Sequence, residues 1–395
     1  MRQKFFAYIF MIIIILTASC AESSIRARFL FIGDIMAHKQ QLDAARYKGQ
    51  NKSLAGTYDF SPQFRRVRPL LINSFLVGNL ETTFSGKKKK LNYSGYPLFN
   101  TPDSLADTLK NYLEIDLLTL ANNHIFDRGA AGARRTTEIL DSQDINWTGL
   151  GLDKIPSNDA VILDNNGIKA AFINYSYGSN LWPKSNDVHL NTLSQENILS
   201  GLKRAKSLSP DIIIACYHWG YEYHYQPSIY QKNDANTTLN NGATLIVGTH
   251  PHVLQPVEVR ISNKYPVKAV AWSLGNFVSF QRTLPRERTY ILAAEFEKDN
   301  GKTRLVKLSA APLYVLAPGQ NKTEIIYTGT HEDTINKLDF TGLSKAQIAK
   351  FQRIGRATLD FLGASDEIDE YGFYTLWKEE SFDILPVSRR KSPKD

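Results

Sequence analysis

The stretch Phe29-Leu30-Phe31-Ile32-Gly33-Asp34 decides the fold, because an apolar run of strand length ends there in a glycine and a carboxylate. Four more runs of this kind end in polar groups: SFLV before Gly78-Asn79-Leu80-Glu81, DLLTL before Ala121-Asn122-Asn123-His124, DIIIAC shortly before His218-Trp219-Gly220, and TLIV before Gly248-Thr249-His250-Pro251-His252. Such runs are typical of buried parallel strands. Ligands bind beyond the carboxyl ends of strands in an open α/β sheet. We therefore expect the five ends to converge on one crevice and form a metal site.

The order of elements predicts a layered α/β domain. Strand-like runs alternate with amphipathic segments from residue 25 to 255, which favours right-handed crossovers. The predicted helices are Pro102–Tyr112, Arg128–Ser142, Ser194–Ser207 and Ile229–Asn241. From residue 256 to 330 the pattern changes to period two, in Pro256–Ile261, Val267–Trp272, Thr289–Phe296 and Thr303–Leu308. Asp299-Asn300-Gly301 is a hairpin signal. We expect these later strands to be antiparallel and to complete a second sheet against the first.

The chain divides into one main domain and two flanking segments. Residues 25–330 form the domain, residues 1–20 precede it, and residues 331–395 form a C-terminal extension. Within it, Leu343–Leu362 is a predicted helix with Ser344 as its cap. The tail Ser388–Asp395 is basic and polar, which predicts disorder.

The first 20 residues predict export. Arg2 and Lys4 precede the apolar stretch Phe5–Leu16, which is too short and too soon interrupted for a membrane span and is typical of a secretory signal. Cys20 follows Ala-Ser, as in bacterial lipoproteins, although Thr17 stands where that pattern usually has Leu. We expect lipidation of Cys20 to anchor the protein to the membrane of the bacterial cell envelope. The alternatives are cleavage near Ala21, giving a secreted or periplasmic protein, and an uncleaved anchor.

Cysteine content excludes a disulfide framework. The chain has 2 cysteines, and the second, Cys216, lies inside an apolar run. Stability must therefore come from burial, for which a chain of 395 residues is long enough. A cysteine in the middle of a strand is more often part of the core than a nucleophile.

The charge balance favours acidic partners. The formal net charge is +8, and Lys87–Lys90 form a basic run just after Glu81. Such runs are often solvated loop surface, but beside a crevice they would attract an anionic substrate. We expect Lys87 and Lys88 to bind it. Nucleic acid is not an expected partner, because the chain shows no basic helix or aromatic-basic platform and carries an export signal.

Six motifs in one order resemble the CapA proteins of poly-γ-glutamate capsule synthesis. They are Phe31–Met36, Gly78–Glu81, Ala121–His124 with Asp127 and Gly129, His218–Tyr223, Gly248–Gln255 and Ser273–Phe277. The resemblance covers about residues 28 to 282. It implies a part in the synthesis or processing of an anionic polymer such as poly-γ-glutamate, or of a cell-wall peptide, and membership of a capsule synthesis complex.

The CapA family is similar in fold to the calcineurin-like metallophosphoesterases. The resemblance therefore implies a four-layer α/β/β/α sandwich and a dinuclear metal site. The implied metal ligands are Asp34, Glu81, Asn123, His218, His250 and His252. Two positions depart from the phosphoesterase pattern: Met36 replaces a histidine, and Asn79-Leu80-Glu81 replaces Gly-Asp. One metal would then be held weakly or be absent.

The expected chemistry is metal-assisted hydrolysis or transfer. Two divalent cations about 3.5 to 4 Å apart can bridge a hydroxide and polarise the bond that it attacks. Carboxylate, amide and imidazole ligands suit one or two Mn or Zn ions per chain. His124 is the expected general acid, since a histidine can protonate a leaving group near neutral pH. Glu222 contacts substrate or serves as a base, or is a surface carboxylate, and Asn276 is expected to bind substrate.

Structural alternatives exist for most of these residues. Asp34 could cap the following helix, Asn122 and Asn123 suit a turn, and the His124 ring could bind only backbone. His38, His189 and His224 match no motif and are interpreted as ordinary loop or surface residues. Trp219, Tyr221, Tyr223 and Tyr225 line a binding groove or are half-buried loop aromatics.

Two classes of function remain open at this point. The first is an enzyme that acts on an amide, with phosphoester cleavage as its closest rival. The second is a non-catalytic surface protein that binds and exports an acidic polymer. Fold analogy alone cannot decide the substrate.

Overall fold

The computed structural model describes residues 24–48, 56–87, 92–152, 160–185, 187–262, 265–319 and 322–379. The predicted signal with Cys20, Lys88, and the tail Ser388–Asp395 lie outside these ranges. Among the described residues, no helix combines the length and the apolar character needed to cross a membrane.

The first sheet is built around the N-terminal strand. β1 (Ile25–Ile35) pairs in parallel with β2 (Phe75–Leu80), which continues in parallel to β3 (Leu117–Thr119) and β4 (Asn146–Thr148). The other edge of β1 carries three antiparallel strands in the order β13 (Arg288–Asp299), β14 (Lys302–Gly319) and β15 (Lys322–Tyr327), and β16 (Tyr374–Lys378) also pairs with β14.

The second sheet comes from the middle of the chain. Its strand order is β11 (Leu254–Ser262), β12 (Tyr265–Leu274), β10 (Leu245–Thr249), β9 (Ile212–His218), β7 (Ile168–Ser176) and β6 (Val161–Asn165). The four central strands are parallel, and the two edge strands are antiparallel to their neighbours. A short ribbon of β5 (Leu150–Leu152) and β8 (Val188–Leu190) lies apart from both sheets.

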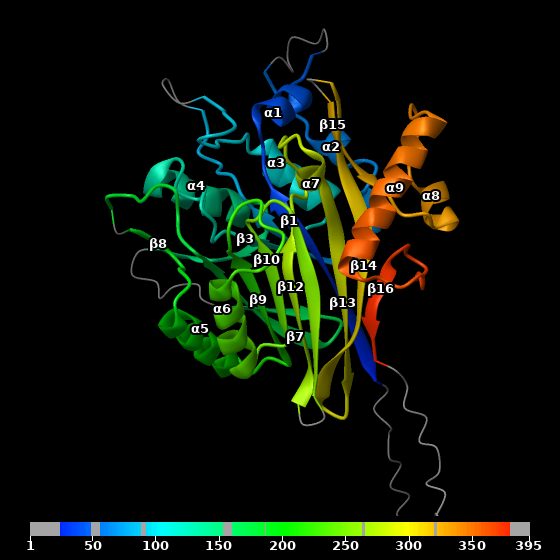
Figure 1. Ribbon diagram of the computed structural model, residues 1–395. Helices are drawn as coiled ribbons and strands as arrows, with labels where there is room; N and C mark the ends of the chain where they lie inside the picture. Colours follow the sequence, from blue (N-terminus) through cyan, green and yellow to red (C-terminus); the bar gives the residue numbers. More distant parts are fainter. Residues whose placement is uncertain are drawn as a thin grey trace, which may run out of the picture.

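The two sheets pack face to face, with helices on the outer faces (Figure 1). Phe29 of β1 meets Phe172 of β7 at 6.2 Å between ring centroids, in the buried cluster between the sheets. The second sheet is covered by α5 (Gln195–Ser207) and α6 (Ile229–Asn240). The first is covered by α1 (Lys39–Ala45), α2 (Ser61–Phe64), η2 (Arg68–Leu70), α3 (Ser104–Asp107), η3 (Thr108–Tyr112) and α4 (Gly129–Ser142). The predicted α/β/β/α sandwich is confirmed.

The assignment of the later strands to a single second sheet is wrong. Only β11 and β12 join the second sheet, whereas β13, β14 and β15 extend the first one. The chain crosses between the sheets through residues 275–287, which include α7 (Leu284–Glu287). Period-two patterning shows that a segment is a strand, but it does not show which sheet the strand joins. β13 pairs with the free edge of β1 and so joins the first sheet.

The predicted helices are confirmed, with one change. α4, α5 and α6 begin and end within one residue of expectation. α9 (Lys345–Leu362) is capped by Ser344, as predicted, whose side chain accepts a hydrogen bond from the Gln347 backbone N–H. The expected helix Pro102–Tyr112 is divided into α3 and the wider turn η3.

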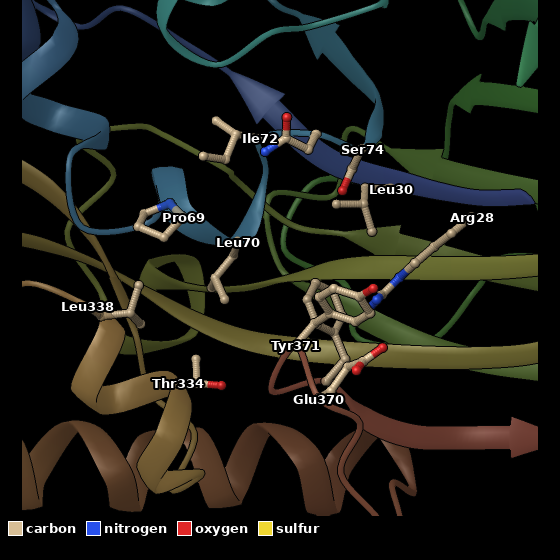
Figure 2. A pocket seen from close by; sticks show the side chains of 12 residues that line it. Arg28, Leu30, Pro69, Leu70, Ile72, Ser74, Thr334, Leu338, Glu370 and Tyr371 are labelled. Atoms are coloured by element: carbon tan, nitrogen blue, oxygen red, sulfur yellow. The ribbon is translucent and has the colours of Figure 1, made fainter. Parts of the chain in front are cut away.

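The C-terminal segment is joined to the first sheet. α8 (Glu332–Lys337) and α9 precede β16, and the loop before β16 holds Arg28 of β1. The Arg28 guanidinium carbon lies 4.4 Å from the ring centroids of both Tyr371 and Phe373, and the group pairs with Asp369 at 3.2 Å. Figure 2 shows Arg28 and Tyr371 at the edge of a cavity of about 330 Å³ between this segment and β1.

Candidate metal centre

Strand ends from both sheets meet at one edge of the sandwich. Asp34 lies at the end of β1 and Glu81 directly follows β2, in the first sheet. His218 ends β9, and His250 and His252 directly follow β10, in the second sheet. All five side chains are buried. The predicted convergence of these strand ends is therefore confirmed, although it takes place between two sheets and not along a single one.

A close approach of two backbones aims Asp34 into the centre. The pairing of β1 with β2 shifts between Ile32 and Asp34, and a Cβ on Gly33 would lie 1.9 Å from the Gly275 carbonyl oxygen. A bulge of this kind redirects the next side chain. The Asp34 carboxylate accepts hydrogen bonds from Asn79 Nδ2 at 2.8 Å and from the His250 backbone N–H at 3.3 Å. Asp34 caps no helix, since α1 begins after His38.

The segment His250-Pro251-His252 is bent, as its proline predicted. His250 has φ of 95° and His252 has φ of 57°, so both adopt a left-handed conformation that is uncommon outside glycine. The bend turns both imidazoles toward the same place, with their ring centroids 5.9 Å apart. His252 Nδ1 lies 2.8 Å from Asn276 Oδ1, while His250 Nδ1 is buried and has no hydrogen-bond partner among the described residues.

His218 is held by its neighbours at both ring nitrogens. Nε2 lies 2.8 Å from Asn123 Oδ1, and Nδ1 lies 3.0 Å from Thr249 Oγ1. Burial, followed by the nearby imidazoles, lowers the pKa of His218 and of His250 well below the ordinary value. Burial thus favours the neutral imidazole, which is the form that binds a metal ion.

Glu81 occupies the middle of the cluster. Its Oε1 lies 3.7 Å from His218 Nε2, 3.9 Å from His252 Nε2 and 4.0 Å from His124 Nε2. Both carboxylate oxygens are buried and accept no hydrogen bond from the described residues. Burial, and next the Asp34 carboxylate, raises the pKa of Glu81 well above the ordinary value. A buried carboxylate without a donor is costly and invites a cation.

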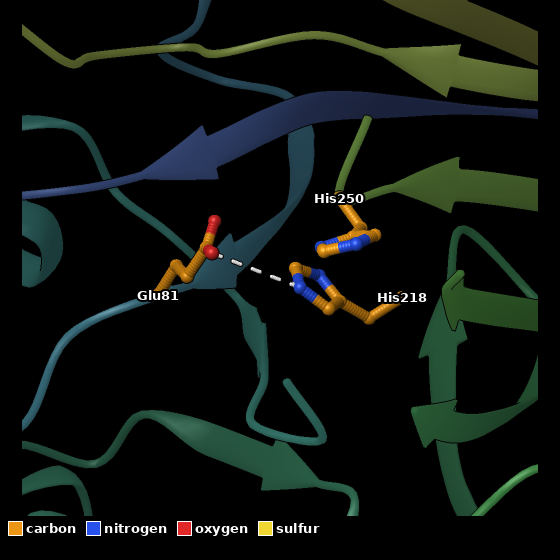
Figure 3. Close-up of side chains that lie close together, drawn as sticks. All are labelled: Glu81, His218 and His250. Atoms are coloured by element: carbon orange, nitrogen blue, oxygen red, sulfur yellow. Dashed lines mark ion pairs between the residues drawn. The ribbon is translucent and has the colours of Figure 1, made fainter. Parts of the chain in front are cut away.

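Three sets of side chains offer ligand atoms within 4.8 Å of one another. The first is Glu81, His218 and His250, shown in Figure 3, and the second is Asp34, Glu81 and His252. These two sets share Glu81. The third is Glu222, His250 and His252. The Glu81 oxygens, which have no partner among the described residues, lie in two of these sets, so the residues fit one or two divalent cations. Asn123 instead contacts His218.

The predicted catalytic and substrate residues lie at different depths. His124 is buried, and its Nδ1 lies 2.9 Å from Asp127 Oδ2, so the ring contacts a carboxylate and not only backbone. Glu222 is exposed at the rim. Asn276 is buried behind His252, and its Nδ2 donates to Gln281 Oε1 and to the Arg286 carbonyl. Lys87 is exposed.

Several residues near the centre were not found from the sequence. His38, interpreted as an ordinary loop or surface residue, is half-buried, and burial followed by His252 and His124 lowers its pKa to about 3. Asn79 binds Asp34, and the Tyr177 ring lies 4.5 Å from that of His250. Of these residues, only His38 could have been found from the sequence, because it lies four residues after Asp34. The interpretation of His189 and His224 as surface residues is confirmed.

Burial and hydrogen bonds decide the remaining structural alternatives. Trp219 belongs to the core, whereas Tyr221, Tyr223 and Tyr225 are exposed. Asn122 Oδ1 accepts a hydrogen bond from the His124 backbone N–H, as in a turn, while Asn123 reaches His218. Cys216 is buried in the core, and burial raises its pKa to about 12.

The layers and the strand-end cluster define a four-layer α/β/β/α protein with a histidine and carboxylate centre suited to divalent cations. Residues 28–281 match the family described as bacterial capsule synthesis protein PGA_cap, which is more than half of the chain. The chain belongs to this family, that of the CapA proteins.

Two relatives support the assignment. The capsule biosynthesis protein CapA of Bacillus anthracis is 30% identical over 260 residues, which are 63% of this chain and 61% of the relative. The PGA biosynthesis protein CapA of Bacillus subtilis (strain 168) is 27% identical over 278 residues, 69% of this chain and 68% of the relative. The match thus spans about three fifths of the Bacillus anthracis protein.

Likeness to solved structures is weaker. NAD nucleotidase of Haemophilus influenzae has a TM-score of 0.45 and 14% identity to this chain, covering 87% of this chain and 61% of the nucleotidase. At this distance the likeness carries no argument about function.

Proposed function

We propose that the protein is an exported, metal-dependent hydrolase or transferase that acts on an amide bond of an anionic cell-surface polymer. The observation that carries the proposal is the pair of ligand sets that share the unpartnered Glu81 carboxylate. The names of its relatives, which concern capsule and PGA biosynthesis, support poly-γ-glutamate as the polymer. A cell-wall peptide has the same amide chemistry and is the alternative substrate.

The residues have distinct roles in this proposal. Asp34, Glu81, His218, His250 and His252 would hold Mn or Zn, since carboxylates with imidazoles suit these ions. When bound, such ions supply a hydroxide at neutral pH and polarise the carbonyl. Asn276 fixes the His252 ring through Nδ1, as outer partners of metal-binding histidines do.

His124 is the proposed general acid. Asp127 holds the ring by Nδ1 and leaves Nε2 facing Glu81, where a proton can pass to the leaving amine. Glu222 lies near His250 and His252 at the exposed rim, where it can contact substrate or accept a proton. Lys87 and Lys88 are proposed to attract the polymer.

Location and partners form part of the proposal. Residues 1–20 are proposed to direct export, with lipidation of Cys20 holding the protein at the membrane of the cell envelope. Cleavage near Ala21 would instead give a secreted or periplasmic protein. Either location gives access to an extracellular polymer and to a capsule synthesis complex.

Metal analysis followed by a turnover assay tests the proposal. The purified chain is expected to carry one or two Mn or Zn ions, which His218→Ala and His250→Ala remove while the fold is retained. The metal-loaded chain is then incubated with poly-γ-glutamate, cell-wall peptides and a generic phosphodiester in parallel. Turnover of the phosphodiester alone would show a metallophosphoesterase and overturn the amide assignment.

A non-catalytic polymer-binding protein is the second candidate. It is favoured by the hydrogen bonds that Asn79 Nδ2 makes with Asp34 Oδ1 at 2.8 Å and with His218 Nδ1 at 3.3 Å. These bonds occupy polar atoms that a fully loaded dinuclear site would use. Absence of bound metal, together with poly-γ-glutamate binding that survives His218→Ala, would support this candidate.

A further inference from the structure

Arg286 lies beside the side chains that face the candidate metal centre. Its guanidinium carbon is 4.1 Å from the ring centroid of Tyr223, and that ring is 6.1 Å from the ring of His252. Glu222, the residue before Tyr223, has a carboxylate that can reach His250 and His252. Arg286 is thus one aromatic ring away from the ligand histidines.

The backbone of Arg286 is tied to the same centre. Asn276 donates through Nδ2 to the Arg286 carbonyl at 3.3 Å, while its Oδ1 contacts His252 Nδ1 at 2.8 Å. The Arg286 N–H donates to the Thr283 carbonyl at 2.9 Å. The arginine and the ligand histidine are therefore held in a fixed relation, which lowers the ordering cost of binding a ligand between them.

The Arg286 side chain has no acidic partner within the described ranges of the chain. The neighbouring Glu287 carboxylate is engaged by Arg282 at 2.6 Å and by the Tyr314 hydroxyl at 2.7 Å. Arg286 is half-buried with its guanidinium over the face of the Tyr223 ring, and no ion pair among the described residues involves it. A guanidinium group presents five donors in a fork that matches a carboxylate.

Another flank of the centre differs in charge. A cavity of about 430 Å³ lies beside Tyr177, whose ring packs 4.5 Å from that of His250. Its lining includes Tyr221, Tyr230 and Asp234, and among the described residues it contains no lysine or arginine. An anionic group would thus find the Arg286 guanidinium as well as the Glu222 carboxylate on the Tyr223 flank, whereas the lining on the Tyr177 flank offers the Asp234 carboxylate and no cation.

We infer that Arg286 binds a substrate carboxylate next to the amide bond, on the His252 side of the centre, and so selects polymers with a free carboxylate beside each amide. This inference rests on the proposed function and narrows its substrate class. It also gives the substrate a direction, with the carboxylate toward Arg286 and an uncharged portion toward Tyr177.

Binding of two matched probes tests the inference. The metal-loaded chain from Ala21 onward is titrated calorimetrically with oligo-γ-glutamate and with the same oligomer carrying carboxamides in place of its free carboxylates. Wild type is expected to prefer the carboxylate probe. Arg286→Gln should weaken that binding by about tenfold or more, the size expected for lost charge-assisted hydrogen bonds, and leave carboxamide binding unchanged. Arg286→Lys, which keeps the charge but not the fork, should fall between the two.

Arg282→Gln is the matched control, because it removes the same charge from the same segment at an arginine already paired with Glu287. It should leave both affinities unchanged. The inference would be overturned if the wild-type protein bound the two probes equally. It would also be overturned if Arg286→Gln weakened the binding of both probes equally or of neither. Metal content and melting temperature, measured on each variant, show whether the fold is kept.

Turnover of the carboxylate probe separates this inference from the proposed function. Arg286-dependent binding without any turnover would contradict the amide chemistry and leave the carboxylate subsite in place. Turnover that is unchanged in Arg286→Gln would support the chemistry and contradict the subsite.

Discussion

At the scale of single residues, Glu81 is fully buried, and its carboxylate accepts no hydrogen bond within the part of the chain that the structure describes. Its carboxylate stands between the imidazoles of His218, His252 and His124 at 3.7 to 4.0 Å, a distance that leaves room for a cation but not for direct hydrogen bonds. Without a cation, burial and the Asp34 carboxylate disfavour the ionised form of Glu81. With one, Glu81 would be the ligand that the two sets share.

Glu81→Gln should therefore have opposite effects in the two states of the protein. In the presence of a chelator the variant should be more stable by about 1 to 3 kcal/mol, because an unpaired buried carboxylate is removed. The bound metal should fall below the wild-type amount. Thermal unfolding with and without chelator, together with elemental analysis, measures both effects. Glu258→Gln, which alters a carboxylate paired with Arg260, is the control; unchanged metal content in Glu81→Gln would contradict the assignment.

Cys216 gives a second test at this scale. Its pKa of about 12 reflects burial, so the thiol stays protonated at pH 8 and should not react with a thiol reagent in the folded protein. Unfolding should expose one reactive thiol in a chain that begins at Ala21. The folded state also resists ionisation, so its stability should decline as the pH rises above about 8.5, where the unfolded thiol loses its proton. Rapid labelling of the native protein would contradict the core assignment.

The clustering of the candidate ligand residues could be predicted because each follows an apolar run closely, and the ends of parallel strands must lie at a common edge. His38 could not be predicted in this way. Its environment comes from His252 and His124, which are distant in sequence. In addition, His38 Nδ1 accepts a hydrogen bond from the Phe280 backbone N–H at 3.2 Å. Asn79 likewise has a role only through its contact with Asp34.

At the scale of elements, the bulge in β1 explains why glycine precedes Asp34. The Gly275 carbonyl accepts a hydrogen bond from the Asp34 N–H at 3.1 Å and lies where a side chain at position 33 would begin. The segment that connects β12 to β13 thus packs directly against the strand end that carries Asp34, a candidate metal ligand.

Gly33→Ala should separate these two backbones. The added Cβ would meet the Gly275 oxygen at 1.9 Å, so we expect a loss of about 2 to 4 kcal/mol in the free energy of unfolding and weaker metal binding. Urea denaturation and metal titration measure the two effects. Gly178→Ala is the control, since a Cβ there meets nothing within 4 Å. Wild-type stability in Gly33→Ala would refute the role of the close approach.

Element types followed from periodicity, but sheet membership did not. The capping boxes of α6 and α9 involve residues three apart in sequence. Because this signal is local, the ends of both helices were predicted closely. The partner of β13 is β1, more than 250 positions earlier, with Phe31 opposite Leu292. No local pattern in β13 distinguishes that edge from the edge of the second sheet.

At the scale of the whole molecule, the C-terminal segment is attached through Arg28. The guanidinium lies between two aromatic rings and pairs with Asp369, while β16 extends along β14. Arg28 and Asp34 are six residues apart on β1, which corresponds to roughly 20 Å of strand. The attachment and the cavity of Figure 2 are therefore remote from the metal centre.

Arg28→Ala should loosen the C-terminal segment without affecting metal binding. We expect a loss of about 1 to 3 kcal/mol, from the cation–π contacts and the ion pair, and faster proteolysis within residues 331–379. Limited proteolysis and elemental analysis on the same sample give both results. Arg26→Ala is the control, because the Arg26 side chain is 65% exposed. Loss of bound metal in Arg28→Ala would contradict the separation of the two regions.

The pairing of β1 with β13 also dictates when the protein can mature. Synthesis proceeds from the N-terminus, so β1 cannot pair with β13 until almost 300 residues have been made. The pocket draws on positions from 34 to 252, and its supporting Asn276 comes later still. Such non-local pairing slows folding. Any cation that these side chains bind would consequently be taken up late in the life of each new molecule, from the ions of the compartment where folding is completed.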